Sequence, residues 1–257
     1  MIPGGRCYLA KSILILLLSY VTVNRAFSQE TKMNPDRPDQ TEEVHVVPKG
    51  RLLIEEGFSV NGFDSGRNAL IIRSLIRYGL VKGVELGFLL EQGRERNRYM
   101  EETVQSTYPL ALRLKIALVE DHAWLPDIAF LGYFQLPFAK DDEGELAHAS
   151  VSALLAFVNE LSDKWKFEYS TGFQQEAFSN KIAWQVYTSL HYKINDKLES
   201  FVGSYSQFQH SQKPFHNVDL GLAYKLKENF QVDVAAGKSV GYDERNFFLT
   251  AGFSVML

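Results

Sequence analysis

Cysteine is almost absent from this chain, because Cys7 is the single cysteine among 257 residues. Disulfide bonds therefore do not hold the fold together. Long apolar runs are also missing after residue 28, where no stretch reaches the length of about 18 residues that suggests a membrane-spanning helix. Any insertion into a membrane must therefore use strands. A basic excess is missing as well, since 27 Lys and Arg stand against 31 Asp and Glu. This balance argues against nucleic acid as a partner.

Residues 1–28 have the features of a secretory signal peptide, with basic Arg6 and Lys11, an apolar stretch over 12–23 and a small-residue site at 26–28. The apolar stretch is too short to span a bilayer as a helix. We therefore expect an exported chain from which this segment is cleaved. Cleavage would remove three basic residues and no acid, which lowers the formal net charge from −4 to −7, and would leave no cysteine.

Residues 29–50 are polar and contain three prolines without a consistent period, which is typical of an extended leader. Beyond them the apolar residues recur with a period of 2. Leu112, Leu114 and Ile116, for example, alternate with Arg113 and Lys115, a pattern that no helix buries on a single face. Twelve segments follow this rule, at about 51–60, 68–80, 83–91, 110–118, 127–137, 146–158, 165–174, 182–194, 198–208, 217–226, 230–238 and 246–257. We predict an all-β fold, a twelve-stranded antiparallel transmembrane β-barrel of the outer-membrane type, over residues 51–257.

The connections and the aromatic residues support this prediction. Short polar turns at 81–83, 159–164, 195–197 and 227–229, with a longer link at 119–126, lie at one end, and most longer loops, at 92–108, 138–145 and 209–215, lie at the other. Aromatic residues in the apolar register stand near both ends: Tyr78, Trp165, Tyr192, Tyr224 and Phe230 beside the short turns, and Phe173, Trp184 and Phe247 opposite. Two aromatic belts at the two membrane interfaces explain this placement.

A soluble β-sandwich or lipocalin-like barrel would alternate in the same way, with its apolar face inward. The signal peptide, the loop asymmetry and the aromatic belts favour the membrane barrel. The last segment keeps apolar residues at alternate positions up to Leu257, so we expect it to close the barrel against the first segment. We also expect the outer-membrane assembly machinery to recognise this segment, although Leu257 stands where phenylalanine is common.

Several short pieces of the chain point to one family. They are the runs Asp36-Arg37-Pro38-Asp39-Gln40-Thr41-Glu42, Val47-Pro48-Lys49-Gly50-Arg51, Ile54-Glu55-Glu56-Gly57-Phe58, Arg77-Tyr78-Gly79-Leu80 and Val84-Glu85-Leu86, with the turns Trp124-Leu125-Pro126 and Leu161-Ser162-Asp163-Lys164. They resemble bacterial outer-membrane transporters named for the putative meta-pathway of phenol degradation, from about residue 36 to the C-terminus. The resemblance implies a barrel channel that takes up small molecules, aromatic ones included. Glu42-Glu43 departs from the family, which tends to carry less charge there.

The face opposite the apolar one is charged, so we expect it to line an aqueous lumen and to bias which solutes pass. The candidate lumen-lining residues are Arg73, Arg77, Glu85, Glu91, Arg113, Lys115, Glu168, Lys193, Asp219 and Asp233. Alternatively, these charges pair across a narrow barrel and have only a structural role. In the leader, Asp36, Arg37, Asp39 and Glu42 are candidates for a plug or gate at the barrel mouth, although a mobile periplasmic tail has the same composition.

Catalysis by a serine hydrolase needs a base beside the nucleophile and a third group that orients the base. The six histidines are scattered, and His210 near Ser206 and Ser211 comes nearest to such a constellation. We therefore expect no enzyme. No histidine pair has metal-ligand spacing with acidic support, and the acidic loop 141–145 is interpreted as solvated. No metal, no cofactor and no phosphate-binding glycine loop is expected.

The sequence thus predicts an outer-membrane channel or transporter for a small solute, aromatic or hydrophobic molecules included, that selects by pore width and lumen charge. Its expected partners are outer-membrane lipid, the solute and the assembly machinery, and its oligomeric state stays open. Two other classes remain. One is a structural or adhesion barrel with a closed lumen, and the other is an outer-membrane hydrolase.

Overall fold

The computed structural model describes residues 32–257 apart from 65, 98–102, 108–109, 123, 140–146, 179–180 and 242–245. The predicted signal peptide and the acidic loop 141–145 lie outside these described residues. The chain divides into two units, Met1–Lys32 and Met33–Leu257, and the second unit holds all the elements below. Among the described residues, no helix has the length and apolar character needed to cross a membrane.

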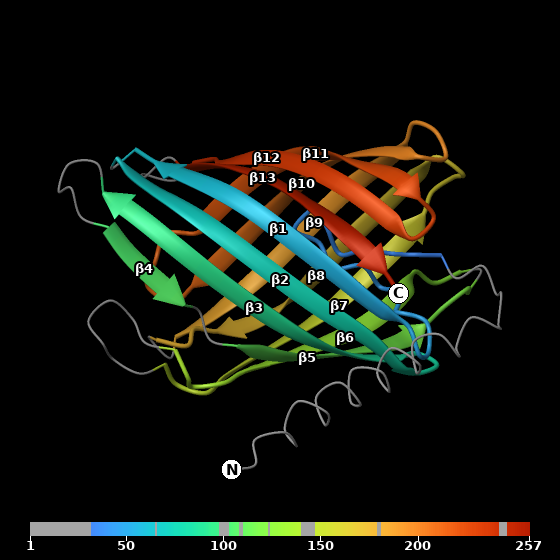
Figure 1. Ribbon diagram of the computed structural model, residues 1–257, viewed down its shortest axis with the longest axis horizontal. Coiled ribbons are helices and arrows are strands. Elements are labelled where there is room, and N and C mark those ends of the chain that lie inside the picture. The colour runs from blue at the N-terminus through green and yellow to red at the C-terminus, as the bar shows by residue number, and fades with distance from the viewer. Residues whose placement is uncertain are drawn as a thin grey trace, which may run out of the picture. The chain divides into compact units, whose positions relative to one another are not determined.

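Met33–Leu257 forms a closed antiparallel barrel (Figure 1). Its strands are β1 (Leu52–Phe63), β2 (Arg67–Val81), β3 (Val84–Asn97), β4 (Thr103–Thr107), β5 (Ala111–Val119), β6 (Asp127–Gln135), β7 (Ser150–Glu160), β8 (Trp165–Gln175), β9 (Ile182–Lys193), β10 (Leu198–Gln209), β11 (Phe215–Lys227), β12 (Phe230–Ser239) and β13 (Asn246–Met256). Each long strand pairs with its neighbours in the chain, and β1 pairs with β13 from Leu53–Met256 to Phe63–Asn246, which closes the ring. The predicted closure by the last strand is therefore confirmed.

Twelve strands build the wall, as predicted, and β4 is not a thirteenth member of the ring. It pairs only with the loop end of β3, from Gln92 to Arg96, while β5 pairs with the other end of β3, from Val84 to Leu89. β4 and β5 are thus consecutive pieces of the same wall position. The sequence predicts a loop over 92–108, but residues 92–97 belong to β3 and residues 103–107 form β4, so pairing continues beyond the predicted strand ends.

The alternation of side chains sets which residues face the interior. In β5, Arg113 and Lys115 are buried inside, whereas Leu112 is 38% and Leu118 55% exposed on the outside. The same parity places apolar residues outward around the ring, as a lipid-facing surface requires. The short connections β2–β3, β7–β8, β9–β10 and β11–β12 lie at one end of the barrel. The strand ranges agree with the prediction within a few residues, and the largest differences are the end of β3 at Asn97 instead of 91 and the start of β7 at Ser150 instead of 146.

The interior is not charged throughout, because β6 and β7 present an apolar patch to the lumen. The patch consists of Ala129, Leu131, Leu154, Ala156 and Val158, all buried, and Val44 of the leader packs on it at 2% exposure. Near the barrel end, Met33 and Val47 of the leader pack with Leu53 and Met256. Burial of these side chains removes apolar surface from water and stabilises the leader inside the ring.

Candidate functional site

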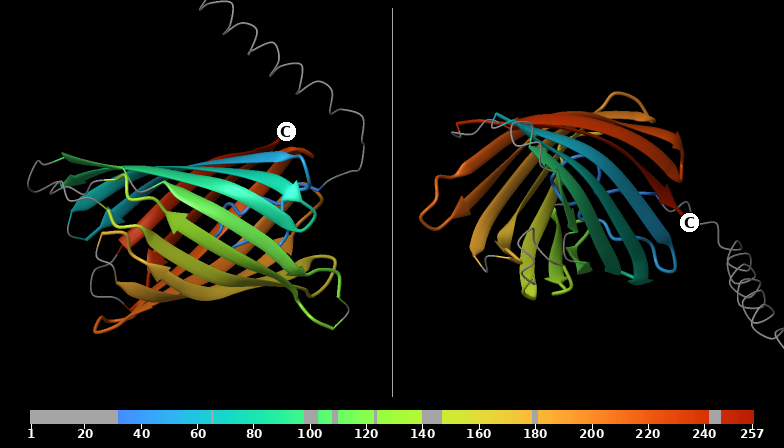
Figure 2. Two further views of the ribbon diagram at one scale, coloured as in Figure 1. Left: turned by 90° about the horizontal axis from the view of Figure 1, so that it is seen from below. Right: turned by 60° about the vertical axis from the view of Figure 1, so that its left-hand side comes forward.

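Residues 33–50, the part of the leader that belongs to the barrel unit, lie along the inside of the wall (Figure 2, blue). The backbone N–H groups of Asp36 and Arg37 donate to Oε2 of Glu55 on β1, at 3.0 and 3.2 Å. Farther along the leader, the N–H of Val47 donates to Oε2 of Glu85 on β3 at 2.8 Å. The wall carboxylates thus satisfy backbone groups of the leader that are withdrawn from water.

Three wall cations lie next to the leader and form what we call the basic cluster, Arg77 on β2 with Arg113 and Lys115 on β5. All three are buried. Arg77 donates to both oxygens of Glu85, at 2.8 and 2.9 Å, and to Oε1 of Glu55 at 2.9 Å. Arg113 donates to the same Glu85 at 2.6 Å. Buried charges are tolerated when each finds such partners.

The leader supplies two further carboxylates to the basic cluster. Asp36 accepts from Nη2 of Arg113 at 2.6 Å and from Nζ of Lys115 at 3.0 Å. Glu42 accepts from Arg113 at 2.8 Å and from the hydroxyl of Tyr133 on β6 at 2.6 Å. The leader and the wall are therefore electrostatically complementary, and withdrawing the leader would leave buried cations with fewer partners.

Arg37 anchors the leader at the seam where β1 meets β13. Its Nη2 lies 2.7 Å from Oδ1 of Asp233 on β12. The guanidinium lies against Gly57 and Gly252, two residues that pair across the seam, and a Cβ atom at either position would overlap it. The absence of side chains at these two glycines is what makes room for Arg37.

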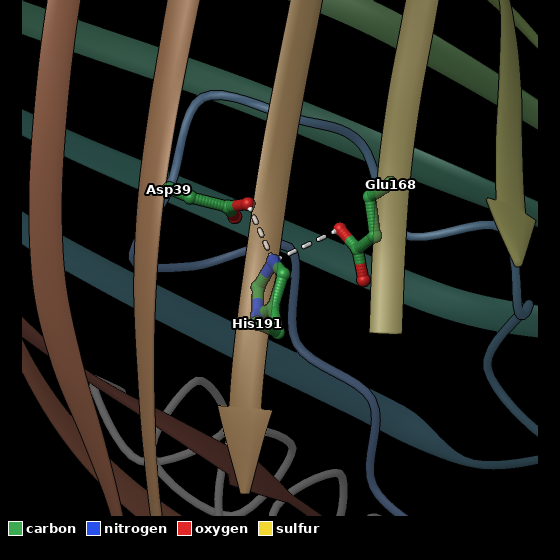
Figure 3. A group of neighbouring side chains, drawn as sticks. All are labelled: Asp39, Glu168 and His191. Atoms are coloured by element: carbon green, nitrogen blue, oxygen red, sulfur yellow. Dashed lines mark hydrogen bonds and ion pairs between the residues drawn. The ribbon is translucent and has the colours of Figure 1, made fainter. Parts of the chain in front are cut away.

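A second group, which we call the histidine cluster, joins the leader to β8, β9 and β10 (Figure 3). Nε2 of His191 lies 3.1 Å from Oδ2 of Asp39 and 3.5 Å from Oε2 of Glu168, and its Nδ1 lies 2.8 Å from Oε1 of Glu199. The hydroxyl of Thr41 donates to Oε2 of Glu168 at 2.9 Å and also contacts Asp39. One ring therefore bridges three carboxylates from three separate segments.

The leader acids differ in how their surroundings affect ionisation. Burial disfavours the charged form of Asp36, but Arg113 and the other cluster cations outweigh burial, so the pKa of Asp36 lies well below its ordinary value. Burial also disfavours the charged form of Glu43, but Lys166 and His45 outweigh burial, so the pKa of Glu43 is lowered as well. At Asp39 burial dominates over the contact with His191, and its pKa is raised. The carboxyl group of Asp36 is therefore more firmly ionised than that of Asp39.

Between the leader and the loop end of the barrel lies a cavity of about 360 Å³, which we call the outer cavity. Its floor is leader residues 36–42. Its wall includes the aromatic residues Phe63, Tyr133, Tyr187, Tyr205 and Phe248, the amides Asn61, Gln135, Gln174, Gln185, Asn217 and Asn246, and the charged pair Arg73 and Glu91. Tyr187 and Tyr205 stack with ring centroids 6.0 Å apart. The cavity therefore offers ring faces and neutral hydrogen-bonding groups above a charged floor.

A family model described as "Putative MetA-pathway of phenol degradation" matches residues 35–257. The chain belongs to this family. No curated protein matches it. Among solved structures, the COG4313 outer membrane channel from Pseudomonas putida F1 is similar at a TM-score of 0.68 and 14% identity, with 88% of this chain and 100% of that chain covered. The NanC porin is similar at a TM-score of 0.54 and 9% identity, covering 77% and 98%. The barrel fold thus matches outer-membrane channels and porins, which confirms the predicted fold class and agrees with the predicted location.

The fold brings several of the predicted site residues together. Arg77, Glu85, Arg113 and Lys115 meet Asp36 and Glu42, while Asp233 meets Arg37 and Glu168 meets Asp39 through Thr41 and His191. Arg73 and Glu91 lie apart from them, 4.0 Å from each other on the wall of the outer cavity. Lys193 reaches neither place. It lies at the end of β9 with its side chain 46% exposed and pairs with Asp196 of the turn at 2.8 Å.

The sequence did not predict five wall residues that contact the leader or the two clusters, namely Glu55, Tyr133, Lys166, His191 and Glu199. The alternation could have found two of them, since Lys166 stands two positions before Glu168 and His191 two before Lys193, on the same face. Their partners in the leader could not have been found that way, because they come from a segment without a period.

His210 with Ser206 and Ser211, the nearest approach to a catalytic constellation in the sequence, does not form one among the described residues. Ser206 lies 2.8 Å from Nδ1 of His216 on β11, not next to a ring nitrogen of His210. Within the described part of the chain, no carboxylate is bonded to that His216 ring. A triad-like arrangement would need such an orienting group.

Proposed function

We propose that this family member is an outer-membrane channel for a small solute and that its leader is the gate. The observation that carries the proposal is the position of leader residues 36–42, which form the floor of the outer cavity and contact the wall on both sides. Solute would enter the outer cavity from the loop end and pass when the leader leaves its seat. Selection would rest on pore width and on lumen charge.

The outer cavity supports a small solute with an aromatic or hydrophobic part. Stacked Tyr187 and Tyr205 offer ring faces, and the amides around them can bind hydroxyl or carbonyl groups. The similar COG4313 structure is described as an outer membrane channel, which agrees with a channel function. Arg73 and Glu91 on the same wall would bias the passage of ions.

A structural barrel with a permanently closed lumen is the second candidate. The observation in its favour is the number of buried ion pairs that hold the leader, which include Asp36 with Arg113 and Arg37 with Asp233. The two candidates differ in one measurable property, because only a channel conducts when the leader is released.

The test is conductance of the purified barrel in planar bilayers, compared with a variant that lacks residues 33–47. We expect low conductance with rare openings from the complete protein and a steady open level from the truncated one. Liposome swelling with sugars, amino acids and aromatic acids would then define the solute. A truncated barrel that folds, as shown by heat-dependent gel mobility, and conducts nothing would overturn the channel. If truncation prevents folding, Asp36→Asn in the complete protein replaces it.

Leader release can be followed separately, because residues 29–257 contain no cysteine. Val44 of the leader is 2% exposed against the apolar patch of β6 and β7, so a Val44→Cys thiol should react only in released molecules. Removal of residues 1–28 also belongs to the proposal, and the mass of the protein isolated from outer membranes tests it.

A further inference from the structure

The histidine cluster has the composition of a metal site. One ligand atom from each of Asp39, Glu168 and His191 lies within 4.8 Å of the others (Figure 3). The three residues come from the leader, β8 and β9, and Glu168 and His191 are buried. Imidazole nitrogen with carboxylate oxygen is a ligand set used by first-row transition ions, Zn²⁺ above all.

The spacing of these atoms suits one shared ion. Ligand atoms at the usual bond lengths from a tetrahedral Zn²⁺ stand roughly 3.3 to 3.6 Å apart. Nε2 of His191 lies 3.1 Å from Oδ2 of Asp39 and 3.5 Å from Oε2 of Glu168. Small side-chain movements would therefore admit the ion without a change in the backbone.

The surroundings of the ring are those that a ligating histidine needs. Nδ1 of His191 lies 2.8 Å from Oε1 of Glu199, so a hydrogen bond there would fix the tautomer that leaves Nε2 free to bind metal. Thr41 holds the carboxylates of Glu168 and Asp39 through its hydroxyl. Glu199 and Thr41 would thus hold the ligand side chains in place, as the hydrogen-bond partners of metal ligands do in zinc proteins.

Charge balance gives an independent reason for a cation here. Asp219 on β11 faces the same region and interacts electrostatically with Asp39 and His191. It is 3% exposed, and its Oδ2 has no hydrogen-bond partner among the described residues. The hydroxyl of Ser189, which pairs with Glu168 across β8 and β9, is buried without a partner as well. Buried acceptors without donors are costly unless a cation or water satisfies them.

Among the described residues, the carboxyl groups around His191 outnumber the cations. Lys166 lies 2.6 Å from Glu168 and 3.6 Å from Glu43. Glu43 also contacts His45 at 2.7 Å. Around the His191 ring, Lys166 and His191 face the carboxyl groups of Asp39, Glu168, Glu199 and Asp219, so carboxyl groups outnumber cations there even when the imidazole is protonated. A divalent ion adds more positive charge than a proton on His191 would.

We propose that Asp39, Glu168 and His191 bind one divalent transition-metal ion of the Zn²⁺ type, which fastens the leader to β8 and β9. The metal site deepens the proposed gate, because the ion would have to leave, or Asp39 would have to release it, before the leader can move. Ca²⁺ and Mg²⁺ should bind poorly, since both prefer sites made of oxygen ligands alone. Binding of the ion itself does not depend on the barrel being a channel.

Titration of ZnCl₂ into the purified, tag-free barrel after treatment with EDTA tests the site. We expect one Zn²⁺ per barrel in the wild type, loss of this binding in His191→Gln, and about 10- to 100-fold weaker binding in Glu199→Gln. His216→Gln is the matched control, because His216 lies at the loop end of β11, away from the cluster, and should bind as the wild type does. Absence of Zn²⁺ binding in the wild type, or equal binding in His191→Gln, would overturn the site.

Two further measurements keep the proposal testable if the His191 variant does not fold. Co²⁺ bound to the wild-type barrel should give the visible absorption of a tetrahedral ion and lose it on addition of Zn²⁺, and no absorption would count against the site. Zn²⁺ should also slow the reaction of the Val44→Cys thiol, with recovery in EDTA. Binding without such protection would contradict the fastening of the leader. A barrel that binds Zn²⁺ but never conducts would instead refute only the channel.

Discussion

Oδ2 of Asp36 lies 2.6 Å from Nη2 of Arg113, and this ion pair joins the leader to β5. Breaking a buried pair by neutralising one member costs about 3–5 kcal/mol when the remaining charge has no other partner. Arg113 keeps Glu85 and Glu42, so the cost here should lie at the lower end of that range. We predict that Asp36→Asn increases the open probability in planar bilayers at least about tenfold. Asp163→Asn, in the exposed β7–β8 turn, is the control and should behave as the wild type does.

The two glycines beside Arg37, Gly57 and Gly252, offer a way to release the leader without changing any charge. A methyl group on Gly57 would overlap the guanidinium of Arg37, so Gly57→Ala should push Arg37 away from Asp233. We expect faster reaction of the Val44→Cys thiol and more frequent channel opening. Gly132→Ala on β6 is the matched control, because a Cβ atom there would meet Phe130 at 3.5 Å, an ordinary van der Waals contact. Equal thiol reactivity in the two variants would show that Arg37 does not hold the leader.

Acid should release the leader only at low pH. The pKa of Asp36 is lowered in the seated leader, so the released chain binds protons more readily than the seated one. The stabilisation is therefore complete above the ordinary value of 3.8 and is lost as the pH falls below it. We predict that wild type and Asp36→Asn differ in Val44→Cys reactivity by a constant factor between about pH 7 and pH 5, and that the difference shrinks below about pH 4. A difference that disappears already at pH 6 would contradict this account.

Charge on the wall of the outer cavity should affect ion selectivity and not gating. Arg73 and Glu91 have side chains that are 46% and 28% exposed, and Nε of Arg73 lies 4.0 Å from Oε2 of Glu91. Because solvent screens such groups, we expect modest shifts of the reversal potential. The shifts should indicate greater cation selectivity in Arg73→Gln and greater anion selectivity in Glu91→Gln. Opposite shifts with unchanged open probability are the expected result in salt-gradient measurements. A change in open probability alone would assign the pair to the gate.

The wall could be predicted from the sequence because alternation is a local signal. The period of 2 places neighbouring residues on opposite faces of a strand, as in Leu112, Arg113, Leu114 and Lys115 of β5. Closing the ring then places the charged face inward. β4 could not be predicted, since its residues 103–107 lie in a polar stretch whose pairing depends on the long β3 hairpin. The sequence likewise could not place the leader, because its Pro-rich and Asp-rich composition is shared by free tails and inserted segments.

The clusters were harder to predict than the strands, for a geometric reason. Asp39 and His191 are 152 positions apart in the sequence. No spacing rule connects a leader without a period to a strand so distant in sequence. Neither residue has the other ligands nearby in sequence. Only the curvature of the wall and the path of the leader bring Asp39, Glu168 and His191 together.

The leader continues directly into β1, and Gly50 is bonded to Gly79 of β2 through its N–H at 2.7 Å. A released leader therefore stays attached to the rim of its own barrel by a tether of a few residues. Short tethers give effective concentrations in the millimolar range, so re-insertion is an intramolecular event that is independent of how many barrels the membrane holds. A separate peptide of residues 33–47, added to the truncated barrel, would have to reach about millimolar concentration to close it as well.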